Sequence, residues 1–179
     1  LTIDTNTVNR KIKLSDNNRK VTRVKEDQSY LDHPDRFDQW PQLLCSNGLT
    51  GRCYWEVEWR GRVDISVSYR GIRRRGDREN CLFGWNDQSW GLTCSDGGYS
   101  VWHNNTMTPV SSSSSSYSSV SDRVAVYVDC PAGSLSFYRV SSDSLIHLYT
   151  FNTTFTEPLY AGFGLLFWSS GSSVSLCRV

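Results

Sequence analysis

Hydrophobic and polar residues alternate along much of this chain, most clearly in the segment Arg123–Val140. The apolar positions on both sides of a short break are Val124, Val126, Val128, Leu135 and Phe137. Alternation of this kind is typical of a strand with one buried face. The break at residues 130–133 ends in Gly133, which readily adopts positive φ, so the segment predicts a β-hairpin. Because a lone hairpin is not stable in water, its apolar face needs a second layer.

The same period of two recurs elsewhere and predicts the partners of this hairpin. Further strands are expected around residues 12–14, 21–24, 53–59, 63–69, 82–84, 89–92, 99–102, 145–151, 159–167 and 173–177. Gly61, between two of these segments, predicts a second hairpin, and Asp16-Asn17-Asn18 predicts a turn. Trp55, Val57 and Trp59 should face the core. No segment shows the period of an amphipathic helix, so we predict an all-β antiparallel sandwich.

Three stretches do not fit strands. Residues 25–44 predict an irregular connector, because His33-Pro34 and Trp40-Pro41 disfavour helix. Residues 70–80 are too polar and glycine-rich for a core strand and predict a surface loop. Residues 111–121 are nearly all serine and predict a mobile loop within one domain.

Length and charge narrow the class of protein. With 179 residues, a single domain spanning positions 1–179 is expected. The 19 basic and 18 acidic residues give a net charge of +1, which provides no reason to expect a nucleic acid or a membrane as partner. The six cysteines form no C-x-x-C pair, which favours reduced thiols over disulfides. Without an apolar membrane-spanning run or a signal segment, we expect a cytoplasmic protein.

Catalysis is not indicated. The three histidines, His33, His103 and His147, stand in no nucleophile or metal motif, so no catalytic residue, metal or cofactor is predicted.

Several segments, in order, are similar to landmarks of the PRY-SPRY (B30.2) family. LTIDTNTVNRKIKLSDNNRKVTRV with DHPDRFDQWPQLLC resembles the PRY part, and YWEVEW, WGL, RVAVYVDCPAGSLSFY, LYAGFGL and VSLC resemble the SPRY part. Within this family, the sequence most resembles the fish versions, which are found in tripartite-motif ubiquitin ligases, NLR-type receptors and stonustoxin-like toxins. The chain departs from the family pattern at Asp4-Thr5 and at Asp129-Cys130-Pro131, where turn character is kept. The resemblance implies a bent, jelly-roll sandwich with a PRY part at 1–48 and a SPRY part at 49–179.

The resemblance also implies binding of a protein or peptide through variable loops. Carried over by position, the family's contacts fall on Asp64, on Tyr99 and Trp102, and on Phe167 and Trp168, with His103 and Ser169 in the same loops. The arginines of residues 70–78 add Arg73 and Arg74, which could bind an acidic or phosphorylated partner. The candidate partner-binding residues are therefore Asp64, Arg73, Arg74, Tyr99, Trp102, His103, Phe167, Trp168 and Ser169.

Each candidate also has a structural interpretation. If Tyr99 and Val101 face inward, Trp102 faces outward, and the same logic applies to Trp168 after Phe167. Such an outward tryptophan either anchors a partner or packs under a neighbouring loop. Asp64 either pairs with a basic group of the partner or accepts a hydrogen bond in a turn. The arginine cluster is either an anion site or a solvated loop.

Three functions remain open from the sequence. The first is the ligand-recognition module, monomeric by itself, of a cytosolic immune protein such as a tripartite-motif ligase. The second is a structural or assembly domain at the C-terminus of a secreted stonustoxin-like pore-forming protein. The third is carbohydrate binding through exposed tryptophans.

Overall fold

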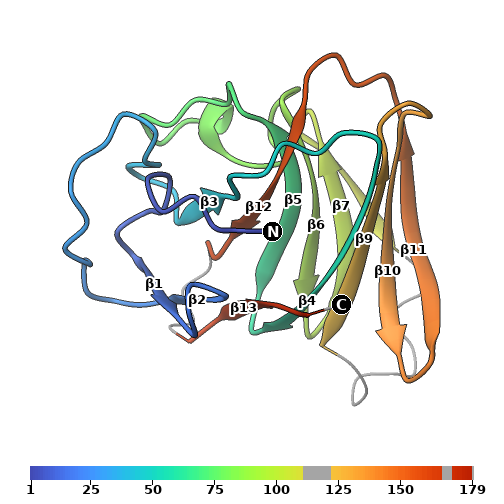
Figure 1. The fold of residues 1–179 in the computed structure, drawn as a ribbon, viewed down its shortest axis with the longest axis horizontal. Coiled ribbons are helices and arrows are strands. Elements are labelled where there is room, and N and C mark those ends of the chain that lie inside the picture. The colour runs from blue at the N-terminus through green and yellow to red at the C-terminus, as the bar shows by residue number, and fades with distance from the viewer. Residues whose placement is uncertain (111–121, 167–170, 179) are drawn as a thin grey trace.

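The computed structural model describes residues 1–110, 122–166 and 171–178, and these form two antiparallel sheets packed face to face (Figure 1). The seven-stranded sheet has the order β1-β2-β13-β4-β9-β10-β11, and the six-stranded sheet has the order β3-β12-β5-β6-β7-β8. The strands of the first are β1 (Ile12–Ser15), β2 (Lys20–Arg23), β13 (Ser173–Leu176), β4 (Arg52–Arg60), β9 (Arg123–Asp129), β10 (Ser134–Ser141) and β11 (Ser144–Asn152). Those of the second are β3 (Gln42–Leu44), β12 (Leu159–Gly164), β5 (Val63–Tyr69), β6 (Ser89–Ser95), β7 (Gly98–His103) and β8 (Thr106–Val110). The predicted all-β sandwich is confirmed.

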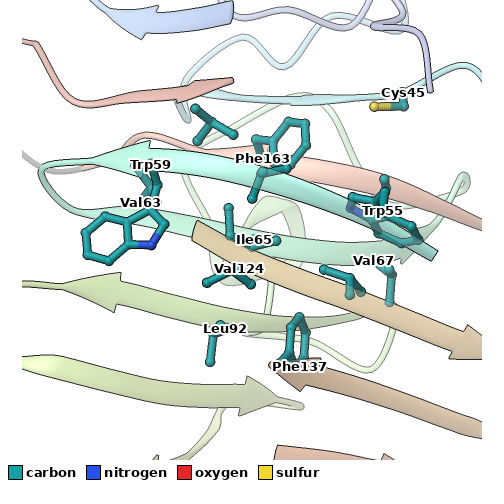
Figure 2. Close-up of a cluster of buried hydrophobic side chains, with 14 of the residues drawn as sticks. Cys45, Trp55, Trp59, Val63, Ile65, Val67, Leu92, Val124, Phe137 and Phe163 are labelled. Carbon is teal, nitrogen blue, oxygen red and sulfur yellow. The ribbon is translucent and has the colours of Figure 1, made fainter. Parts of the chain in front are cut away.

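The core lies between the two sheets and includes side chains that alternation predicted to face inward (Figure 2). It also contains residues outside the predicted strands, such as Ile3, Val8, Leu43 and Val110. On β4, Trp55, Val57 and Trp59 are buried, while Tyr54 and Glu58 on the other face are exposed. Burying large apolar side chains of this kind contributes about 1.5–3 kcal/mol each. The outer face of the six-stranded sheet is partly covered as well, because β5 and β6 are buried on both faces and Phe83 packs over Gly162 of β12.

The hairpin at Arg123–Val140 forms as predicted. β9 and β10 pair in register from Asp129 opposite Ser134 to Val124 opposite Arg139. Gly133 at the turn has a φ of 71°. Because β9 also pairs with β4, and β10 also pairs with β11, the hairpin lies between these two strands in the seven-stranded sheet. The predicted turn at residues 16–18 is also present, with positive φ at all three positions.

The second predicted hairpin is wrong. β4 pairs with β9 and β13, whereas β5 pairs with β6 and β12, so the chain crosses from one sheet to the other at Gly61. Alternation places Trp59 and Val63 in the core in either arrangement, because a strand with one buried face has the same pattern in both sheets. The inward faces were therefore predictable, but the pairing was not.

The segment after the arginine-rich loop also differs from the prediction. Instead of a strand at residues 82–84, the chain forms a short 3₁₀-helix, η1 (Glu79–Cys81), followed by turns. Two strands were not predicted: β3 lies within the expected connector, and the edge strand β8 is polar and contains Pro109. The predicted serine-rich loop at 111–121 lies outside the described residues. No helix in the described part of the chain is long and apolar enough to cross a membrane.

Thr7 links the N-terminal segment to β3 through a buried hydroxyl. Its Oγ1 donates to the carbonyl of Asp4 at 2.7 Å and accepts from the N–H of Leu44 at 2.9 Å. Thr7→Val keeps the shape but leaves that N–H without an acceptor, so we expect a loss of about 1–2 kcal/mol of unfolding free energy. Urea denaturation measures it. Thr5→Val, at an exposed position, is the control and should change stability by less than about 0.5 kcal/mol; equal losses in both variants would contradict a role for this hydroxyl.

Candidate functional site

A groove with a volume of about 830 Å³ lies on the outer face of the six-stranded sheet. Its floor comes from β5 and β6, and its walls come from the segments before β3 and β6 and from β7. The PRY part contributes one rim. The lining residues used below are Trp40, Pro41, Asp64, Ser66, Leu82, Phe83, Trp85, Gly91, Thr93, Trp102 and Leu166. The groove is therefore built from segments that are far apart in the sequence.

The floor of the groove lies close to the backbone of the sheet because glycines stand on the two strands next to β5. Ser66 lies opposite Gly91 of β6 on one side and Gly162 of β12 on the other. A Cβ at Gly91 would lie 2.6 Å from the Ser66 hydroxyl, closer than real contacts allow. A side chain at that position would push the Ser66 hydroxyl aside, and without one the groove reaches down to the sheet there.

Asp64 is the charged group of the floor. Its Oδ1 accepts a hydrogen bond from the Thr93 hydroxyl at 2.6 Å. Burial raises the pKa of Asp64 to about 6, although the Thr93 hydrogen bond and the charge of Arg62 act in the opposite direction. Among the described residues, no basic group lies within salt-bridge distance of this carboxylate. A carboxylate held in this way favours a partner that brings positive charge or a hydrogen-bond donor.

Ser66 has a hydroxyl without a hydrogen-bond partner in the described part of the chain. The residue is 1% exposed, and its Oγ is fully buried. Buried polar groups normally have partners, so an unpaired hydroxyl in the lining of a groove indicates a place where a ligand atom can bind.

Two tryptophans form one wall. The rings of Trp85 and Trp102 stack with centroids 4.8 Å apart and planes inclined by 17°. Trp85 is held by its neighbours: the N–H of Gly84 donates to Ser89 Oγ at 2.8 Å, and Asn86 Nδ2 donates to the carbonyls of Glu79 and Leu82. The wall is thus positioned before any partner arrives, which lowers the entropic cost of binding.

The facing wall rests on a second, smaller apolar cluster. Phe83 packs edge to face on Phe37 with centroids 5.6 Å apart, and Leu44 and Ile72 complete the cluster. Trp40 contributes its ring and donates from Nε1 to the carbonyl of Arg78 at 3.2 Å. The arginine-rich loop is therefore attached to the wall.

The structure brings two of the predicted residues, Asp64 and Trp102, together in the groove. Arg73 is exposed in the loop beside it. Arg74 is held within the fold: its guanidinium lies 5.1 Å from the Phe37 ring and donates to the carbonyls of Ile72, Asp35 and Arg70. Those hydrogen bonds give Arg74 a structural role within the fold. A contact between Arg74 and a partner stays a prediction.

Tyr99 and His103 lie on the inner side of β7, opposite Trp102, as the alternation argument required. Tyr99 packs edge to face on Trp59, and burial raises its pKa. His103 stacks on Trp90 with centroids 4.5 Å apart, and its Nδ1 is 2.8 Å from the carbonyl of Ser89. Neither residue lines the groove. Phe167, Trp168 and Ser169 lie outside the described residues, immediately after Leu166 of the groove lining.

Comparison with the profiles of known protein families shows which family this chain belongs to. Residues 1–49 match the profile of the PRY family, the SPRY-associated domain, and residues 52–179 match that of the SPRY domain. The chain belongs to the PRY-SPRY family. The resemblance seen in the sequence is confirmed.

The PRY-SPRY relatives include toxin subunits and tripartite-motif proteins. Neoverrucotoxin subunit alpha of Synanceia verrucosa is 41% identical over 92% of this chain, and tripartite motif-containing protein 16 of Mus musculus is 34% identical over 92%. The chain spans 23% and 29% of the lengths of these relatives.

Solved PRY-SPRY structures share the fold. The stonustoxin structure superposes with a TM-score of 0.90 at 37% identity, covering 99% of this chain and 28% of the other. The TRIM65 PSpry domain superposes with a TM-score of 0.84 at 28% identity, covering 100% and 90%. SPRY domains thus occur both in tripartite-motif proteins and in stonustoxin-type toxins.

Proposed function

We propose that this domain is a protein-recognition module that binds an extended segment of a partner protein in the groove. The observation that carries the proposal is a preformed groove, walled by the Trp85–Trp102 stack, with an unpaired hydroxyl and a partly buried carboxylate in its floor. Rigid aromatic rings around a desolvated centre are typical of interface hot spots.

The polar groups of the floor support an extended segment as ligand. Asp64 and Ser66 are two residues apart on β5 and point to the same side, so they can contact side chains or amides spaced along an extended chain. In a tripartite-motif parent, such binding would select the protein that the ligase modifies. We also propose that such a parent is cytoplasmic, and the free state of the described cysteines supports this proposal.

A second candidate follows from the similarity to stonustoxin and neoverrucotoxin subunits. In a parent of that kind, the same groove would hold a segment of a neighbouring domain or subunit, and the domain would serve assembly. Both candidates use the groove, but they differ in whether the ligand belongs to another protein or to the parent's own assembly.

A displayed library of random 12-residue peptides tests the groove. We expect selection on the wild-type domain to give peptides whose affinity for Trp85→Ala falls about tenfold, because the wall loses one of its rings. Tyr54→Ala is the matched control, since Tyr54 is an exposed aromatic residue on the other sheet. Peptides that lose affinity for Tyr54→Ala and not for Trp85→Ala, or a failure to select any peptide, would count against groove recognition.

A further inference from the structure

We propose that the partner inserts an arginine side chain into this groove, with its guanidinium against Asp64 and its flat face against the Trp85–Trp102 wall. This inference rests on the proposed function, because it names the chemistry of the group that the groove recognises. Three observations carry it: one open carboxylate oxygen, one unpaired hydroxyl, and an aromatic wall beside them.

The first observation is the free side of the Asp64 carboxylate. Oδ1 accepts from Thr93, while Oδ2 accepts no hydrogen bond within the described residues. Opposite Asp64 on β12 stands Gly164, and a Cβ there would lie 3.2 Å from Oδ2. The glycine keeps that side of the carboxylate uncovered. A cation that donates to Oδ2 would offset the cost of holding the charge in a buried position.

The groups around Asp64 set the local charge. Arg62, just before β5, favours the ionised carboxylate, and Cys94 of β6 is buried in the core nearby. Lys11 at the rim is paired with Asp27 at 2.8 Å. The other charged groups of the lining are Arg23, Asp77 and Glu79. Within the described ranges, neither acidic side chain at the rim is in a salt bridge. The lining holds three acidic and three basic groups, so the attraction for a cation comes from the Asp64 carboxylate itself and not from an excess of negative charge.

The second and third observations select arginine over lysine. A guanidinium is planar and has five N–H donors, so it can reach the Asp64 carboxylate and the Ser66 hydroxyl at once and still stack on an indole. An ammonium group is compact and cannot stack in this way. Arginine therefore satisfies the orphan hydroxyl, the open oxygen and the aromatic wall together.

Nine-residue peptide sets with a fixed central residue test the inference. The centre is arginine, citrulline, lysine or glutamine, and the other positions are random. Citrulline has nearly the shape of arginine without its charge. At pH 7.5 we expect the wild-type domain to bind the arginine set about tenfold more tightly than the citrulline set. Asp64→Asn should remove this preference, so that the arginine and citrulline sets bind the variant with similar affinity.

The pH dependence provides a second readout. Since burial raises the pKa of Asp64, the carboxylate gains a proton as the pH falls from 7.5 to 5, and the preference for arginine should decline in wild type but not in Asp64→Asn. The same raised pKa means that the ionised group opposes folding at neutral pH. Asp64→Asn should therefore unfold at a higher urea concentration than wild type at pH 7.5.

The outcomes separate the inference from the proposed function. Equal binding of the arginine and citrulline sets by the wild-type domain overturns the arginine proposal and leaves groove recognition standing. Binding of none of the four sets overturns both. The comparison of the two sets on wild type needs no variant, so it stands even if Asp64→Asn folds poorly.

Discussion

Alanine at position 133 is expected to destabilise the domain by about 3 kcal/mol or more. Gly133 has a φ of 71°, where a side chain costs about 1–2 kcal/mol. An added Cβ would also lie only 1.8 Å from the carbonyl oxygen of Thr153. The Thr153 segment would have to move, and its N–H would lose the 2.8 Å hydrogen bond to the Gly133 carbonyl.

Urea denaturation of Gly133→Ala measures this loss. Gly71→Ala is the matched control, because Gly71 has no positive φ and no atom within 4 Å of an added Cβ. The control should change stability by less than about 0.5 kcal/mol. A loss of under about 1 kcal/mol at position 133 would contradict the close approach of the Thr153 backbone.

Trp102→Ala is expected to weaken binding of groove-selected peptides about 30-fold, or about 2 kcal/mol. The change removes the indole that stacks on Trp85 and faces the floor. It keeps the Cβ, which is the atom that packs over Gly84. The turn that carries Trp85 should therefore remain in place, and the loss should be confined to binding.

Titration calorimetry of wild type, Trp102→Ala and a control variant measures this effect. Leu145→Ala is the control, since Leu145 is 48% exposed on β11 of the other sheet. We expect its affinity to match that of wild type. Unchanged affinity of Trp102→Ala, with the fold intact, would remove this tryptophan from the binding surface.

The fold was predictable because alternation fixes which side chains face the core. That pattern gave the central hairpin, the inward face of β4 and the outward direction of Trp102. It could not decide that β4 and β5 belong to different sheets, because both arrangements bury Trp59 and Val63. Strand pairing depends on contacts between distant segments, which a local period does not contain.

The site was less predictable because the groove combines distant segments. Asp64 and Trp102 were expected to contact a partner, and both line it. The sequence did not predict Trp85, because the alternation of residues 82–84 indicates a strand where the chain forms turns. The signal for it is the Gly84-Trp85-Asn86 sequence, in which glycine and asparagine favour a turn. The internal use of Arg74 could not be predicted, because its carbonyl acceptors come from two loops.

The most direct test of groove recognition locates a bound peptide on the surface. A selected peptide with a nitroxide label at one end is added to the ¹⁵N-labelled domain, and the indole N–H resonances of Trp85 and Trp102 are recorded. We expect these resonances and the amides of Asp64 and Gly91 to broaden, while Tyr54 and Tyr127 on the seven-stranded sheet stay sharp. Broadening around Tyr54 and Tyr127, with the groove resonances unchanged, would contradict recognition through the groove.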